Sequence, residues 1–204
     1  MKKIINALLF SATALLAIAG TQAQAGLVDF EADTLGSKAN GFISGGVTFS
    51  DTNGSGLNVM NGLPTECASA SNHCLANFGD DTGGLRMDFF ANMASMSLDF
   101  GNDNLGFIAV DGLAYLQLFM NNVLVGEASV VVNLDDIMNQ TISYTGLAFN
   151  SAIFTYTDAN KNPVGLIEVV DNINYKSNEV PEPTSIALLG LGMLGFAAAR
   201  RRKQ

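Results

Sequence analysis

Short apolar runs alternate with clusters of Gly, Asn, Asp and Ser through the middle of the chain, from residue 26 to residue 176. Within the runs, apolar and polar residues often alternate, as in residues 153–158 (IFTYTD), and a period of two is typical of a strand with two different faces. The sequence has no amphipathic helical stripe of useful length. The pattern therefore predicts about ten short strands with turn signals roughly every 8 to 15 residues, which favours an all-β fold, an antiparallel and jelly-roll-like β-sandwich, over βαβ units.

The runs that we expect to form strands lie at residues 26–32, 45–51, 57–60, 85–90, 95–101, 106–112, 113–120, 123–132, 141–146, 151–158 and 164–175, with 91–94 (ANMA) separating the fourth from the fifth. The clearest local prediction is a hairpin in which Asn121 and Asn122 join residues 113–120 to residues 123–132. Asn suits this position because it tolerates the left-handed conformation of a tight turn. Residues 134–140 (LDDIMNQ) fit a helical turn, which leaves the fold class unchanged.

The first 25 residues differ from this pattern. Lys2 and Lys3 precede a mostly apolar stretch at residues 4–19, and residues 23–25 (AQA) have the small-x-small form that signal peptidase accepts. A permanent anchor or a buried helix would also be apolar, but the stretch is short for an anchor and the cleavage site is present. We expect a cleaved signal peptide at residues 1–25, export of the chain, and a mature N-terminus at Gly26.

The last 28 residues differ as well. A polar linker at residues 177–183 is followed by sixteen uncharged, mostly apolar residues at 184–199 and by a basic tail at 200–204. A sixteen-residue helix spans about 24 Å, slightly less than a bilayer core of ~30 Å, which flanking side chains and bilayer thinning can accommodate. The positive-inside rule keeps the basic tail cytoplasmic, so the sequence predicts a single transmembrane helix with the sandwich outside.

The C-terminal features resemble one known signal. A Pro-Glu-Pro triplet, an apolar span containing glycines and a terminal arginine cluster occur in the order of the PEP-CTERM sorting signal; the residues are Pro181, Glu182, Pro183, Gly190, Gly192, Gly195, Arg200, Arg201 and Arg202. The alternative is a plain C-terminal anchor with prolines nearby. The resemblance implies processing by exosortase, transient attachment to the inner membrane, and delivery to the cell surface or to an exopolysaccharide matrix. Because this family has diverse middle domains, the resemblance implies no chemistry for the rest of the chain.

Charge excludes one class of partner. Residues 26–183 contain four Lys and Arg and nineteen Asp and Glu, so their net charge is −15. Nucleic-acid binding rests on neutralising phosphates with cationic side chains, so we expect no nucleic-acid partner. Divalent cations suit such a surface better.

The two cysteines, Cys67 and Cys74, lie seven positions apart in a stretch of small polar residues. In an exported chain this spacing favours a disulfide that closes a short loop. A metal site with His73 as third ligand is the alternative, but the paired-cysteine or two-histidine patterns of zinc sites are absent. We expect His73, the only histidine, to be an exposed loop residue.

A weaker resemblance concerns the middle of the chain. Residues 26–32 (GLVDFEA) and 169–175 (VVDNINY) resemble the first and last strands of jelly-roll domains similar to carbohydrate-binding modules. The resemblance implies a structural Ca²⁺ held by Glu31 and Asp171, and hard oxygen ligands suit this ion. The alternative is that both are ordinary surface carboxylates at strand ends.

The sequence offers little support for catalysis. Asp80-Asp81 and Asp135-Asp136 lie in turn contexts, where Asp bonds its own backbone. A single histidine, the lack of a Gly-x-Ser-x-Gly elbow and the lack of a P-loop lysine give no catalytic arrangement.

The sequence therefore predicts a non-enzymatic, exosortase-sorted protein of the cell surface or exopolysaccharide matrix, with a structural or adhesive role. The alternatives are a calcium-stabilised glycan-binding module and, less favoured, an enzyme that acts on polysaccharide.

Overall fold

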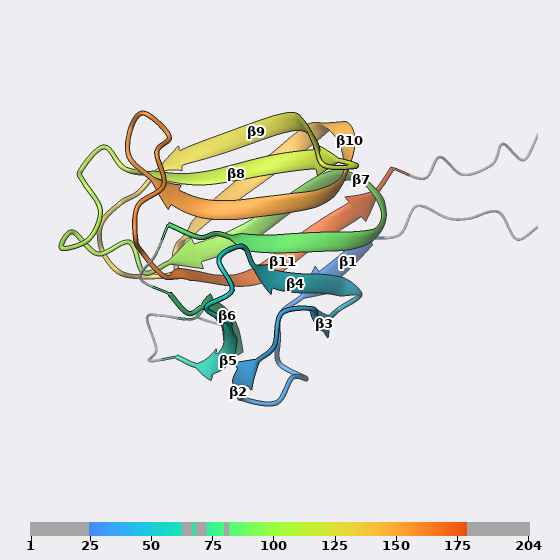
Figure 1. Cartoon of the computed structure of the whole chain (residues 1–204), viewed down its shortest axis with the longest axis horizontal. Helices are drawn as coiled ribbons and strands as arrows, with labels where there is room; N and C mark the ends of the chain where they lie inside the picture. Colours follow the sequence, from blue (N-terminus) through green and yellow to red (C-terminus); the bar gives the residue numbers. More distant parts are fainter. Residues whose placement is uncertain (1–24, 63–66, 68–72, 80–81, 179–204) are drawn as a thin grey trace, which may run out of the picture. The chain divides into compact units, whose positions relative to one another are not determined.

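The computed structural model describes residues 25–62, 67, 73–79 and 82–178 (Figure 1). The predicted signal peptide at 1–25 lies outside this part except for Ala25. The sorting motif, the predicted transmembrane helix and the basic tail lie outside it entirely. Within the described part, no helix is long and apolar enough to cross a membrane.

Eleven antiparallel strands make up the regular structure of the described residues. They are β1 (Ala25–Val28), β2 (Gly36–Lys38), β3 (Phe42–Ser44), β4 (Val47–Asp51), β5 (Leu57–Asn61), β6 (His73–Asn77), β7 (Leu85–Gly101), β8 (Leu113–Met120), β9 (Val123–Val131), β10 (Gln140–Thr157) and β11 (Glu168–Ser177). The all-β, antiparallel prediction is confirmed.

Two long strands, β7 and β10, join the layers of the sandwich. The first half of β10 (residues 140–145) pairs with the second half of β7 (95–100), and the second half of β10 (151–154) pairs with the first half of β7 (85–88). Between these stretches the register shifts near Phe149, and both strands turn back at the same end of the molecule (Figure 1). Each long strand therefore contributes one half to each layer.

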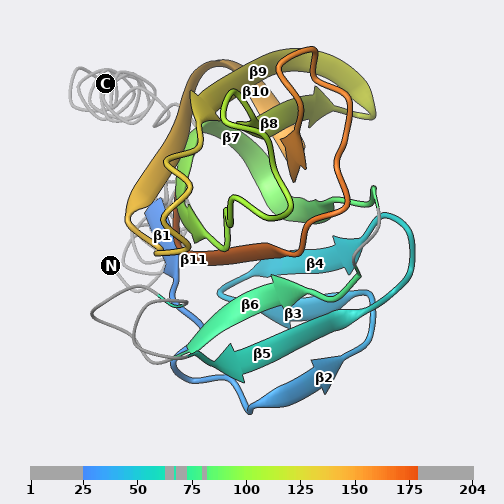
Figure 2. The same cartoon turned by 90° about the vertical axis from the view of Figure 1, so that its left-hand side faces the viewer.

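The remaining strands extend the layers. In one layer β8 and β9 continue from the second half of β10, while β4 and β3 continue from the first half of β7. In the other layer β11 pairs with the second half of β7 and is itself flanked by β1 and β6. β5 and β2 follow β6 in the sheet order (Figure 2).

Aromatic and aliphatic side chains fill the space between the layers. The largest fully buried side chains of the main core include Tyr156, Phe30, Phe49, Phe100, Phe149 and Phe154. They come from β4, β7, β10 and the segment after β1. Because successive strand residues point to opposite faces, every second residue of these strands enters the core.

Several local predictions were wrong because long-range pairing overrides the local pattern. Residues 91–94 do not separate two strands, since β7 runs through them and Met93 is fully buried. The runs at 141–146 and 151–158 are likewise parts of one strand, β10. Residues 106–112 form a loop, not a strand, with Phe107 and Val110 exposed and Ile108 buried.

Residues 134–140 do not form the expected helical turn. The carboxylate of Asp103 accepts hydrogen bonds from the backbone N–H groups of Leu134 and Asp136, at 2.9 and 3.1 Å. Both residues have positive φ, 66° and 60°, which a right-handed turn does not allow. The buried Asp103 carboxylate thus shapes this loop from outside it.

The predicted hairpin is confirmed. Asn121 and Asn122 join β8 to β9 with φ of 51° and 65°, as a tight turn with two left-handed residues requires. At the other end of the domain, β11 continues through Lys176 to Ser177, the point at which the sequence predicted the start of the linker.

Candidate functional site

A shallow polar cleft lies on the outer face of the layer that contains β1, β11 and the paired halves of β7 and β10. Its volume is about 390 Å³. The polar side chains that line it are Ser95, Ser97, Ser143, Thr145, Asn174 and Lys176. We call this feature the polar cleft.

Strand register brings these residues together. On β7, Ser97 lies between Ser143 of β10 and Asn174 of β11. The next row has the same order, with Ser95 between Thr145 and Lys176. Met96 on β7 and Tyr175 on β11 lie between these residues along their strands; both are almost fully buried and also line the cleft. Two parallel rows of small polar side chains therefore face solvent, and they leave room for the cleft.

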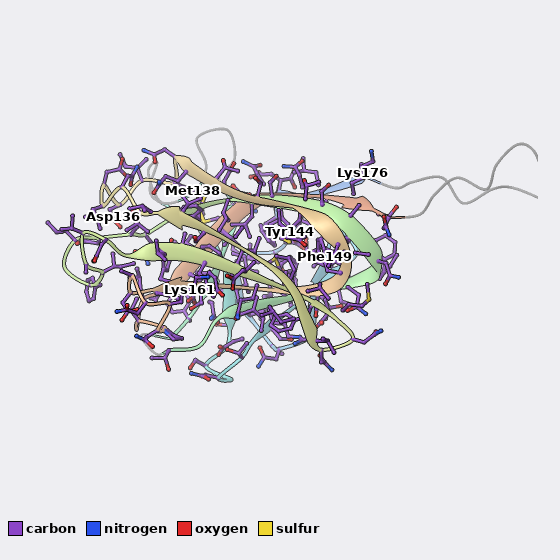
Figure 3. All side chains as sticks on the ribbon, turned by 90° about the horizontal axis from the view of Figure 1, so that it is seen from above. Asp136, Met138, Tyr144, Phe149, Lys161 and Lys176 are labelled. Carbon is purple, nitrogen blue, oxygen red and sulfur yellow. A yellow bond between two sulfur atoms is a disulfide. The ribbon has the colours of Figure 1, made fainter. Side chains whose placement is uncertain are left out.

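The cleft is an exception to the acidity of the domain. None of its lining residues is acidic, and Lys176 contributes a positive charge. The structure gives Lys176 no carboxylate partner within the described residues, whereas Arg86 pairs with Asp88 and Lys161 pairs with Glu127. Figure 3 shows Lys176 and Lys161 on well-separated parts of the surface.

A second charged group lies on the other layer, around Tyr115. The Tyr115 hydroxyl and the Lys161 ammonium both donate to the Glu127 carboxylate, and Lys161 Nζ lies 4.9 Å from the centroid of the Tyr115 ring. Lys161 and then Tyr115 lower the pKa of Glu127. Burial, and then the bond to Glu127, raise the pKa of Tyr115. All three side chains satisfy one another, so this group holds the loop after β10 in place.

A buried acid lies where β6, β10 and β11 meet. Glu168 is 1% exposed; its Oε2 accepts from Asn77 Nδ2 at 3.0 Å and its Oε1 accepts from Thr155 Oγ1 at 3.2 Å. Burial raises the pKa of Glu168 to about 8, against the opposing effect of these hydrogen bonds. The side chain has no contact with the polar cleft, and we assign it a structural role.

The two residues predicted to hold calcium belong to neighbouring segments. Glu31 follows β1, and its Oε1 accepts a hydrogen bond from the His73 backbone N–H at 3.0 Å. Asp171 is buried on β11, the partner strand of β1, and its Oδ1 accepts from the Asn172 N–H at 2.7 Å. The described residues contain no group of three or more His, Cys, Asp or Glu side chains that could hold a metal ion. Calcium binding by Glu31 and Asp171 stays a prediction.

The predicted disulfide is confirmed. Cys67 and Cys74 are bonded, with their Cα atoms 5.4 Å apart, and both are buried in a small second core with Ala76, Met138 and Val169. His73 was wrongly predicted to be an exposed loop residue. It begins β6, is half-buried, and its Nδ1 lies 3.2 Å from the Phe30 carbonyl oxygen.

The acidic pairs have different outcomes. Asp135 forms the predicted turn, since its Oδ1 accepts from the Ile137 N–H at 2.9 Å. Asp80 and Asp81 lie outside the described residues.

Sequence reasoning missed the polar cleft. Its three serines and one threonine come from two strands, β7 and β10, and form no local motif, so only their place at alternate strand positions could have indicated an outward face.

Comparison with known proteins identifies the C-terminal segment. Residues 179–203 match the family model described as the PEP-CTERM protein-sorting motif. The chain therefore carries a PEP-CTERM sorting motif, which marks an exported protein that is anchored in the membrane and then processed by exosortase. No curated protein is significantly similar to the chain.

Solved structures with a similar arrangement include two carbohydrate-binding modules. One is a family 6 module from Clostridium stercorarium in complex with cellobiose. It is 12% identical to this chain, with a TM-score of 0.38, and the match covers 63% of this chain and 87% of the module. The other, of family 29, has 14% identity, covers 79% and 99%, and also has a TM-score of 0.38. These modules are of the class that the middle of the sequence resembles.

An enzyme domain is similar at the same level. The catalytic domain of a GH87 α-1,3-glucanase in complex with nigerose has 8% identity and a TM-score of 0.38, and covers 80% of this chain but 30% of its own. At these TM-scores, neither the modules nor the enzyme indicate what this chain binds or whether it catalyses a reaction.

Proposed function

We propose that the mature protein is a non-enzymatic component of the cell surface or exopolysaccharide matrix, and that its sandwich binds polysaccharide at the polar cleft. The observation that carries this proposal is the cleft itself, a hollow of about 390 Å³ in which hydroxyl, amide and ammonium groups lie beside apolar surface from residues such as Met96 and Tyr175. Its position on an open sheet face suits a chain-like ligand, because both ends of such a ligand can continue beyond the cleft.

The chemistry of the cleft matches that of a sugar chain. Hydroxyl groups both donate and accept hydrogen bonds, so Ser95, Ser97, Ser143 and Thr145 can pair with sugar hydroxyls in either sense. Each such bond contributes only about 1 kcal/mol net in water. We therefore expect weak binding at each site and firm attachment through many copies, which is a structural or adhesive role.

The non-enzymatic part rests on the composition of the cleft. Hydrolysis of a glycosidic bond ordinarily requires two carboxyl groups facing each other across the sugar, and no carboxylate lines the cleft. We expect no release of reducing ends when the protein is incubated with exopolysaccharide from its host. Measurable release that depends on a residue of the cleft would overturn this part.

Blocking the cleft tests the binding site. Ser97 lies at the centre of its row, so Ser97→Tyr should place a ring in the cleft and reduce sedimentation with host exopolysaccharide at least about tenfold, the effect of losing roughly 1.4 kcal/mol. Ser129→Tyr is the matched control because Ser129 is exposed on β9, in the other layer. Equal binding by both variants and the unchanged protein would mean that the cleft is not the site.

Calcium stabilisation is a second candidate, supported by the pairing of β1 with β11, which brings the chain segments of Glu31 and Asp171 close together. If the ion binds there, Glu31→Ala or Asp171→Ala should lower the melting temperature in calcium buffer and matter little with a chelator. A melting temperature of the unchanged protein that does not respond to calcium would end this candidate.

A further inference from the structure

The polar cleft is also where the predicted mature N-terminus lies. In the ladder between β1 and β11, Ala25 is opposite Lys176 and Gly26 is opposite Tyr175, and all four residues line the cleft. Cleavage before Gly26 would remove Ala25 and create an α-amino group beside Lys176. An α-amino group titrates near pH 8, so it is mainly cationic at neutral pH.

The position of this N-terminus is fixed by packing. A Cβ at Gly26 would clash with the ring of Tyr175, whose hydroxyl donates to the Gly45 carbonyl oxygen at 2.6 Å. Glycine thus allows β1 to lie directly against the Tyr175 side chain. With its first residues paired in the sheet, the N-terminus has a defined place in the cleft.

Charge distribution then decides which ligand fits. Residues 26–183 have a net charge of −15, yet the cleft has no acidic lining residue and holds Lys176. The other cations of the described part are engaged: Arg86 and Lys161 form ion pairs, and Lys38 Nζ donates to Thr34 Oγ1 at 2.8 Å. The cleft is therefore a cationic spot on an anionic surface.

We propose that the polar cleft recognises the carboxylate groups of an acidic, uronate-containing polysaccharide through Lys176 and the α-amino group of Gly26. This inference rests on the proposed function and adds the class of polysaccharide. Charge-assisted hydrogen bonds from two ammonium groups hold the carboxylate, and the surrounding serine and threonine hydroxyls bind the neutral sugar hydroxyls. Repulsion from the rest of the domain is screened beyond about 8 Å at physiological ionic strength.

A matched pair of ligands tests the charge requirement. Oligogalacturonate and its methyl ester have the same sugar backbone, but only the first carries free carboxylates. Isothermal titration at physiological ionic strength, with the processed protein recovered from its host, should show at least tenfold tighter binding of the acid than of the ester.

Two changes to the protein test the residues. Lys176→Gln should weaken binding of the acid about tenfold and leave binding of the ester unchanged. Lys38→Gln is the control, because it removes the same charge from β2, which does not line the cleft. Selective transamination of the N-terminal amine to a carbonyl should cause a second, separate loss of several fold for the acid alone.

The outcomes separate this inference from the proposed function. Equal binding of acid and ester, blocked by Ser97→Tyr and indifferent to Lys176→Gln, would overturn the inference and leave polysaccharide binding at the cleft intact. Binding that Ser97→Tyr does not affect would overturn both. A mature N-terminus other than Gly26, found by mass spectrometry, would overturn the role of the α-amino group.

Discussion

Folding clearly changes the ionisation of Glu168. It begins β11, where its carboxyl accepts hydrogen bonds from Asn77 of β6 and Thr155 of β10, and burial raises its pKa from the ordinary 4.5 to about 8. Because the folded-state pKa is the higher one, folding favours the protonated carboxyl. The resulting contribution to stability is complete below about pH 4.5 and is lost as the pH rises toward 8.

We therefore expect the free energy of unfolding to depend on this one side chain between pH 5 and pH 8. Across that window the unchanged protein should lose about 4 kcal/mol through Glu168. Glu168→Gln keeps a neutral hydrogen-bonding side chain. The free energy of unfolding of this variant should therefore fall correspondingly less between pH 5 and pH 8, as measured by urea unfolding at both pH values. Parallel pH profiles for the two proteins would contradict the assignment.

Glu127→Gln is the control for this experiment. Lys161, followed by Tyr115, lowers the pKa of Glu127. Any contribution of this carboxylate to stability is therefore present above its ordinary pKa and is lost only as the pH falls through the lowered value. That range lies below pH 5. The variant should keep the slope of the unchanged protein between pH 5 and pH 8.

The hairpin between β8 and β9 is the element whose turn chemistry can be tested most directly. Asn122 has φ of 65°, and its Oδ1 accepts from Arg86 Nη2 at 3.3 Å on the surface. The left-handed conformation costs a residue other than Gly, Asn or Asp roughly 1–2 kcal/mol. Asn122→Val should therefore lower the free energy of unfolding by about that amount, whereas Asn122→Gly should change it by less than about 0.5 kcal/mol.

Urea unfolding of the two variants separates backbone strain from the side-chain contact. Both variants lose the bond to Arg86, but only Val must adopt an unfavourable φ. Equal destabilisation by Val and Gly would show that the contact with Arg86, not the turn conformation, is what matters.

Local sequence signals predicted an element correctly where the residues of that element alone determine its conformation. The Asn121-Asn122 turn sets its own conformation, so its hairpin could be read from the sequence. The continuity of β7 and β10 could not, because residues 91–94 were predicted to end one strand, yet pairing with distant parts of the chain keeps Met93 within β7. Residues 106–112 have the apolar content of a strand, yet they form a loop in which Ile108 is buried.

At the scale of the whole molecule, the covalent and targeting features could be predicted and the candidate site could not. The Cys67–Cys74 disulfide and the sorting motif are local sequence patterns. The polar cleft exists only after β1, β7, β10 and β11 align, and serine and threonine at alternate positions are equally consistent with any solvated sheet face. The candidate binding surface of this domain follows from strand register rather than from any single segment.

The matched sorting motif predicts how the chain is processed and in which cell fraction the mature protein is found. Pro181-Glu182-Pro183 lies at the start of the matched residues 179–203, between the sandwich and the predicted membrane span. Proline generally disfavours helix and restricts the residue before it to extended conformations, which suit recognition by a processing enzyme. Replacing the triplet with three alanines should keep the chain in the inner-membrane fraction with its C-terminus intact at Gln204.

Intact mass spectrometry of surface and membrane fractions measures this outcome. The unchanged protein should be found at the surface, starting at Gly26 and ending near the Pro-Glu-Pro triplet, and Asn178→Ala, just outside the matched residues, should behave in the same way. If the alanine variant still reached the surface in trimmed form, the triplet would not direct processing. If the unchanged protein retained residues 184–204 at the surface, the chain would be a permanently anchored protein, and its cleft would act at the membrane instead of in the matrix.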